Sequence, residues 1–301
     1  MTDPSVDGLL ITDPTKFEKQ LKELHMAPEK LASMIDHTKL SPDKTASSIE
    51  TLCDEAKAYG FASVCVNPYW VPLVSRRLQG STVKVCTVIS FPLGSTLPEA
   101  KVGEARLAAE AGASELDMVM NIGAMRDGKH DVVENDIRGV VNLARQKGAL
   151  VKVILEVGYL TDEQVRQACE IAEAAGADFV KTATGFGPMG ATIHHVRIMR
   201  ETVGERMGVK AAGGIRNFKD VLRMIAAGAS RIGTSAGVEI MEGYRWAELS
   251  EAWTDIEEIP CKLCPVRAAD SAKMPKDVYS YYKSKCHECA YKDTYNRFYW
   301  R

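Results

Sequence analysis

Short apolar runs rich in β-branched residues recur along the chain, separated by longer amphipathic segments. They lie at 34–40, 61–67, 83–89, 114–121, 150–157, 178–184, 208–213 and 229–235. Their apolar character is nearly continuous instead of alternating, which is typical of strands buried on both faces of a parallel sheet. The pattern therefore predicts eight buried parallel strands.

The segments between these runs carry signals for the start of a helix. Residues 96–99 and 161–164 each fit a capping box, in which two side chains satisfy free backbone N–H groups of the first turn. Eight strand–helix units over about 220 residues predict an α/β fold, a closed (β/α)8 or TIM barrel. An open doubly wound sheet is the alternative, but the first run is not followed by the glycine-rich turn that such a sheet favours.

Both ends of the chain fall outside this strand–helix repeat. Residues 1–30 are predicted to be an N-terminal extension with one amphipathic helix at 16–24, and residues 31–254 to form the barrel. From residue 255 to 301, Cys, Tyr and Lys become frequent, which indicates a separate Cys-rich tail. One barrel of about 250 residues accounts for most of the 301 positions.

Composition and charge narrow the classes of partner. The chain is 46% hydrophobic and 26% charged, as in ordinary globular proteins, and its net charge of -2 provides no basic field for nucleic acid or an anionic membrane. No apolar run reaches the ~18 residues of a membrane span, and the N-terminus lacks the pattern of a signal peptide. We expect a cytoplasmic protein that acts on a small molecule.

Charged residues inside four consecutive apolar runs are the first chemical signal. Lys152, Lys181 and Lys210 occupy the fifth, sixth and seventh runs, and Asp117 the fourth. Adjacent parallel strands would bring these side chains together at the C-terminal mouth of the barrel, where barrel enzymes place their sites. A second ammonium and desolvation favour the neutral, nucleophilic form of a lysine. The cluster therefore predicts imine chemistry with a carbonyl substrate.

Glycines after the last two runs indicate an anion site beside this cluster. Gly213 and Gly214 follow the seventh run, and Gly233 and Ser235 lie at the end of the eighth. Glycine lets backbone N–H groups approach a phosphate closely, and these two loops form the usual phosphate site of the architecture.

Motifs on separate runs resemble those of the deoxyribose-phosphate aldolase family. The resemblance covers about residues 30 to 245 in order. The matching segments are IDHTKL (35–40), VCVNP (64–68), VISFP (88–92), LDMVMN (116–121), VKTATGFG (180–187), VKAAGGI (209–215) and RIGTS (231–235).

The resemblance implies a class I aldolase that reversibly cleaves 2-deoxy-D-ribose 5-phosphate to D-glyceraldehyde 3-phosphate and acetaldehyde without a catalytic cofactor. It assigns the imine to Lys181, the perturbing charge to Lys210 and proton relay to Asp117. The predicted substrate-binding residues are Asp36, Lys152, Thr184, Gly185, Gly213, Gly214, Gly233 and Ser235. A homodimer or higher homo-oligomer is expected. Two departures concern the phosphate contacts: Phe186 stands where some members carry a basic residue, and Ala236 where a second serine is frequent.

The tail carries a separate metal-binding pattern. Cys261 and Cys264 form one C-x2-C pair, and Cys286 and Cys289 form another, with 21 residues between the two pairs. This spacing predicts a structural zinc site of four thiolates. An iron–sulfur cluster, a redox pair and unliganded thiols are the alternatives.

Two other functions fit parts of the same pattern. A phosphate-binding isomerase or epimerase would use Asp117 as a base and need no nucleophilic lysine. A non-catalytic barrel would act through a partner-binding tail at residues 255–301.

Overall fold

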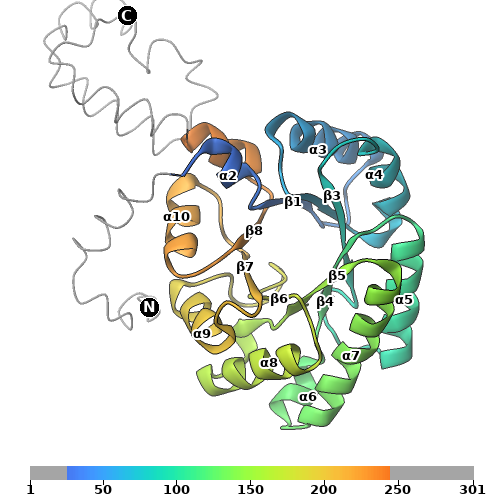
Figure 1. Ribbon diagram of the computed structural model, residues 1–301, viewed down its shortest axis with the longest axis vertical. Coiled ribbons are helices and arrows are strands. Elements are labelled where there is room, and N and C mark those ends of the chain that lie inside the picture. The colour runs from blue at the N-terminus through green and yellow to red at the C-terminus, as the bar shows by residue number, and fades with distance from the viewer. Residues whose placement is uncertain (1–25, 245–301) are drawn as a thin grey trace, which may run out of the picture. The chain divides into compact units, whose positions relative to one another are not determined.

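The computed structural model describes residues 26–244, and within this range eight parallel strands form a closed barrel in chain order (Figure 1). This confirms the (β/α)8 prediction, and the open-sheet alternative is wrong. The strands are β1 (Ile35–Lys39), β2 (Ser63–Val66), β3 (Lys84–Ile89), β4 (Glu115–Val119), β5 (Leu150–Ile154), β6 (Phe179–Lys181), β7 (Gly208–Ala212) and β8 (Arg231–Thr234). Each lies within one of the eight predicted runs.

Helices surround the strands on the outside of the barrel (Figure 1). They are α2 (Pro28–Ala32), α3 (Ala46–Tyr59), α4 (Val71–Arg77), α5 (Pro98–Glu110), α6 (Ile122–Arg126), α7 (His130–Lys147), α8 (Asp162–Ala174), α9 (Ile193–Val203) and α10 (Phe218–Ala226). Two 3-10 turns, η1 (Pro68–Trp70) and η2 (Val157–Tyr159), follow β2 and β5. Helical residues resume at Gly237 and continue to the end of the described range.

One of the two predicted capping boxes is present. Thr161 caps α8, and its side chain and that of Gln164 each accept from the other residue's backbone N–H. The box predicted at 96–99 is wrong, because α5 begins at Pro98 with Leu97 as its cap. Proline suits the first helical position, where its missing N–H costs no hydrogen bond. The Thr96 hydroxyl lies 2.7 Å from the Ser90 hydroxyl instead.

Strand register brings charged side chains together inside the barrel. Lys181 of β6 is the register partner of Lys210 of β7, and Asp117 of β4 is the partner of Lys152 of β5. Lys152 is also paired with Phe179, two residues before Lys181, so it lies one layer of side chains deeper. Successive interior layers of the barrel therefore carry the predicted charges.

Among residues 26–244, no helix is long and apolar enough to cross a membrane. The helix predicted at 16–24 and the four tail cysteines lie outside the described residues. The division of the chain at residues 30 and 254 stays a prediction.

Candidate active site

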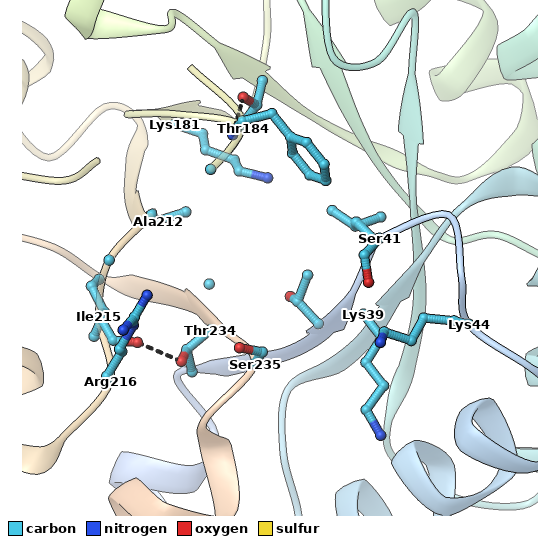
Figure 2. Close-up of a pocket in the computed structure, with 17 residues that line it drawn as sticks. Lys39, Ser41, Lys44, Lys181, Thr184, Ala212, Ile215, Arg216, Thr234 and Ser235 are labelled. Atoms are coloured by element: carbon cyan, nitrogen blue, oxygen red, sulfur yellow. Dashed lines mark hydrogen bonds between the residues drawn. The ribbon is translucent and has the colours of Figure 1, made fainter. Parts of the chain in front are cut away.

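A cavity of about 480 Å³ opens where the strands end. Its wall is built by loops that follow β1, β6, β7 and β8, together with the last residues of these strands. Figure 2 shows the Lys181 side chain extending into this space, with Thr234 and Ser235 across from it. The predicted residues on the wall are Lys181, Thr184, Gly185, Gly213, Gly214, Gly233 and Ser235.

A single carboxylate oxygen of Asp117 contacts two lysines, Lys181 of β6 and Lys210 of β7. Its Oδ2 lies 2.8 Å from the Nζ of Lys181 and 2.7 Å from the Nζ of Lys210. The side chains of Asp117 and Lys210 are completely or almost completely buried, and that of Lys181 is 3% exposed. Two amines that share one carboxylate oxygen are close enough for the charge on one to disfavour a charge on the other.

Further ion pairs extend this cluster towards the other end of the barrel. Lys152 Nζ lies 2.8 Å from Asp117 Oδ1 and 2.6 Å from Glu115 Oε2. Asp36 Oδ2 lies 2.5 Å from Lys210 Nζ, and its Oδ1 lies 2.7 Å from Arg231 Nη1. We call the whole set the buried charge network: Asp36, Glu115, Asp117, Lys152, Lys181, Lys210 and Arg231.

The pKa shifts inside the network keep most members ionised. Burial alone would raise the pKa of Asp117, but the ammonium groups of Lys152, Lys181 and Lys210 hold it well below its usual range. Burial opposes the charge of Lys210, yet the Asp117 and Asp36 carboxylates raise its pKa above the ordinary value. The pKa of Lys152 is likewise raised well above its ordinary value, against burial, by Asp117 and Asp36.

The network has one more basic side chain than it has carboxylates. Within residues 26–244, the carboxylates that form ion pairs with Lys152, Lys181, Lys210 and Arg231 are Asp36, Glu115 and Asp117. Lys152 and Lys210 each contact at least two carboxylates, whereas Lys181 contacts Asp117 alone. The one member of the network that reaches the cavity is thus also the basic side chain with the fewest carboxylate contacts within the network.

Two of the predicted glycines are required by close contacts. A Cβ on Gly233 would lie 3.0 Å from Lys210 Cε and 2.9 Å from Ala212 Cβ, so this glycine leaves room for the lysine stem. Gly213 has a φ of +95° and passes the backbone of Gly190, whose Cα would lie 2.9 Å from an added Cβ. A side chain at either position would displace the wall of the cavity.

Four predicted site residues lie beneath the cavity and not on its wall. Asp117 forms an ion pair with Lys181, and Lys210 forms one with the same oxygen of Asp117, as expected for residues that act on Lys181. Asp36 and Lys152 were expected to line the pocket, but both are fully buried in the layer below. They contact Lys210 and Asp117, so their link to the cavity is through these two residues.

The structure adds cavity residues that the sequence reasoning missed. Lys39, Lys44 and Arg216 bring basic side chains to the wall. Arg216 directly follows the Gly213–Gly214–Ile215 segment, a position that could have signalled an anion contact. Glu156, a fully buried carboxylate after β5, lies against the loop that carries Thr184.

Comparison with known proteins identifies the family. Residues 30–243 match the DeoC/LacD family aldolases. Deoxyribose-phosphate aldolase from Thermococcus gammatolerans is 59% identical over 220 residues, covering 72% of this chain and 98% of that protein. Deoxyribose-phosphate aldolase 1 from Bacillus licheniformis is 58% identical over 71% of this chain and 96% of its own. The tetrameric deoxyribose phosphate aldolase of Aeropyrum pernix is 37% identical, with a TM-score of 0.73 over 77% of this chain and 98% of that one. This chain belongs to the DeoC/LacD aldolase family.

Proposed function

We propose that the chain reversibly cleaves 2-deoxy-D-ribose 5-phosphate to D-glyceraldehyde 3-phosphate and acetaldehyde through a Schiff base on Lys181. The observation that carries this proposal is that Lys181 alone of the buried charge network lines the cavity. Relatives more than half identical over nearly their whole length bear the name of this aldolase.

Imine formation begins with the neutral amine of Lys181. Its nitrogen attacks C1 of the open-chain sugar, and loss of water gives an iminium. Lys210 stays charged and so disfavours the ammonium form of Lys181 between turnovers. Asp117, whose Oδ2 contacts both nitrogens, is placed to pass protons to and from the atoms that react at Lys181.

The iminium then serves as the electron sink for carbon–carbon cleavage. A base removes the proton of the C3 hydroxyl, C3 becomes the carbonyl of glyceraldehyde 3-phosphate, and the C2–C3 electron pair moves to form an enamine. Protonation of C2 restores the iminium, and water releases acetaldehyde and the free lysine. The iminium formed between Lys181 and C1 of the sugar accepts the electron pair, so the chemistry requires no catalytic cofactor.

The phosphate end of the substrate fits the part of the cavity that lies between the loops following β6, β7 and β8. Gly213 and Gly214 have φ values of +95° and +80°, and Gly233 and Ser235 complete the predicted anion-binding set. Backbone N–H groups of such glycine turns bind phosphate well. Arg216, together with Lys39 and Lys44, adds positive charge on the same cavity, where Phe186 supplies none.

The activity is tested directly with the purified full chain. With 2-deoxyribose 5-phosphate, we expect acetaldehyde and glyceraldehyde 3-phosphate in equal amounts, measured by enzyme-coupled reduction of both aldehydes. Addition of a chelator should leave the initial rate unchanged, because no metal takes part in the steps above. A protein that isomerises the sugar without releasing acetaldehyde would contradict the proposal.

We also propose that Cys261, Cys264, Cys286 and Cys289 hold one structural zinc ion. Four thiolates in two C-x2-C pairs suit tetrahedral zinc. Metal analysis of protein purified without chelator should give about one zinc per chain, and Cys261→Ser should release it while the barrel keeps its thermal unfolding transition. Metal-free protein with four titratable tail thiols would contradict the site.

The remaining proposals concern assembly and location. We propose a homodimer or higher homo-oligomer in the cytoplasm, without nucleic-acid or membrane partners. The tetrameric structure of the Aeropyrum pernix relative supports an oligomer. The small net charge supports the lack of nucleic-acid partners.

A further inference from the structure

A buried carboxylate outside the charge network stands next to the cavity. Glu156 follows β5 directly and is 1% exposed. Its φ is +53°, in the left-handed region that glutamate seldom adopts. The backbone on both sides of it is held against β6, because Leu155 N–H bonds to Lys181 O and Val157 N–H bonds to Thr182 O. Such strain at a buried position persists only where the surroundings hold it in place.

The carboxylate of Glu156 holds the loop that leaves β6. Its Oε2 accepts from the backbone N–H of Thr184 at 3.2 Å and from the Thr184 hydroxyl. The Thr184 hydroxyl oxygen in turn accepts from Phe186 N–H at 3.0 Å. Thr184, Gly185 and Phe186 all lie on the cavity wall, three to five residues after Lys181.

The same loop then passes directly over the carboxyl group. A Cβ added to Gly187 would lie 2.7 Å from the Glu156 carboxyl carbon and 2.8 Å from Oε1. Among the described residues Oε1 has no hydrogen-bond partner. The carboxylate is thus enclosed by the loop and fixes it at two points, by hydrogen bonds at Thr184 and by contact at Gly187.

We propose that Glu156 is a positioning residue for the cavity: its carboxylate sets the path of residues 184–187 and so the shape of the wall that faces the phosphorylated part of the substrate. This inference rests on the function proposed above for the site. It assigns Glu156 to ligand binding, because the contacts of Glu156 reach Thr184 and Gly187. The amine of Lys181 is held by Asp117, and Glu156 acts on it only through its charge.

Removal of the Glu156 carboxylate is expected to weaken substrate binding and to leave imine formation intact. In Glu156→Ala, KM for 2-deoxyribose 5-phosphate should rise about tenfold or more, as for the loss of hydrogen bonds to a charged acceptor. Borohydride trapping of acetaldehyde, which has no phosphate, should stay within about threefold of wild type because it needs no binding energy from this wall. Glu156→Gln keeps an acceptor oxygen, so its KM should be close to the wild-type value.

Partner variants test whether the contacts act as one unit. Thr184→Val should raise KM, and Glu156→Ala combined with Thr184→Val should be no worse than Glu156→Ala alone. Gly187→Ala should reproduce the effect, because its methyl group meets the carboxyl. Glu163→Ala, on the exposed start of α8, is the matched control and should behave as wild type.

Hydrogen exchange of the segment 182–192 provides a readout that does not depend on activity. Exchange at the Phe186 amide should be faster in Glu156→Ala than in wild type, with the exchange of β1–β5 unchanged. An unchanged KM with unchanged exchange would overturn the inference, as would an equal loss of trapping and of sugar cleavage. If the alanine variant does not fold, Glu156→Gln and Thr184→Val decide by the same measurements. A wild-type protein that neither traps acetaldehyde nor cleaves the sugar would refute the proposed function, while exchange would still decide the role of Glu156.

Discussion

Borohydride added together with acetaldehyde is expected to leave an ethyl group on Lys181 and to abolish the cleavage of 2-deoxyribose 5-phosphate. Reduction of an imine converts it to a stable secondary amine on the nucleophilic lysine. Lys181 has a single carboxylate contact and reaches the cavity, whereas Lys152 and Lys210 are fully buried and multiply paired. Peptide mass mapping locates the label.

Lys181→Ala is the corresponding variant, and its turnover should fall on the order of 10⁴-fold or more, as when a covalent nucleophile is removed. Lys44, which also lines the cavity but pairs with exposed Asp43, is the internal control and should stay unlabelled. A label on Lys210 with Lys181 unmodified would reverse the assigned roles. Full cleavage activity without any trapped lysine would contradict the Schiff-base mechanism.

The strands and the lysine cluster could be predicted because their signals are local. A continuous β-branched run identifies a doubly buried strand, and a lysine within it has few explanations apart from a buried partner. Lys181 and Lys210 each lie near the end of such a run, and register makes them neighbours. The (β/α)8 architecture then places them at the mouth of the barrel.

The layer of the barrel in which each charged side chain lies could not be predicted from the sequence. Lys152 looked equivalent to Lys181, yet the stagger of the strands places it beside Phe179, a layer below. Lys101 of α5 is also fully buried, with its Nζ 2.5 Å from Asp136 Oδ2 and 3.0 Å from Val119 O. Nothing in the amphipathic pattern of that helix separates Lys101 from exposed lysines, because its burial depends on how α5 and α7 pack on β4.

The end of β6 shows how side chains override a strand pattern. The apolar run extends to Thr184, but the strand ends at Lys181. Thr182 N–H still bonds to Lys210 O in the neighbouring strand, whereas Thr184 N–H bonds to the Glu156 carboxylate. A left-handed glutamate is rare enough that no sequence rule would place one there. The loop that shapes the cavity was therefore beyond local prediction.

Lys210→Leu is expected to shift the pH profile of imine trapping to higher pH. Lys210 carries a charge that Asp117 and Asp36 stabilise, and it shares Asp117 Oδ2 with Lys181. Without it, Lys181 loses a nearby like charge and gains a larger share of the Asp117 carboxylate. Both changes favour the ammonium form of Lys181, so the neutral amine becomes available only at higher pH.

The size of the shift follows from the charge that is removed. One like charge at about 4 Å contributes roughly 4 kcal/mol at an effective dielectric of ~20, which corresponds to about a thousandfold change in a protonation equilibrium. Relaxation of the cluster reduces this, so we expect trapping near neutral pH to fall by about 100-fold and to recover as pH rises. Trapping rates measured across the pH range with acetaldehyde, which lacks the phosphate, separate this effect from substrate binding.

The same substitution removes the ammonium group that lies 2.5 Å from Asp36 Oδ2. The loss of this buried ion pair lowers the stability of the fold independently of any effect on Lys181. Asp36 keeps its contact with Arg231 in this variant, and Lys210→Leu combined with Asp36→Asn removes both charges of the lost ion pair. Both variants should retain the circular dichroism of a folded barrel. The role of Lys210 is as we assign it if the alkaline shift is present in Lys210→Leu and is smaller in the double variant, which also lacks a carboxylate that favours the ammonium form of Lys181. A profile of wild-type shape at reduced amplitude in both variants would show that Lys210 supports the fold of the site and does not set the charge of Lys181.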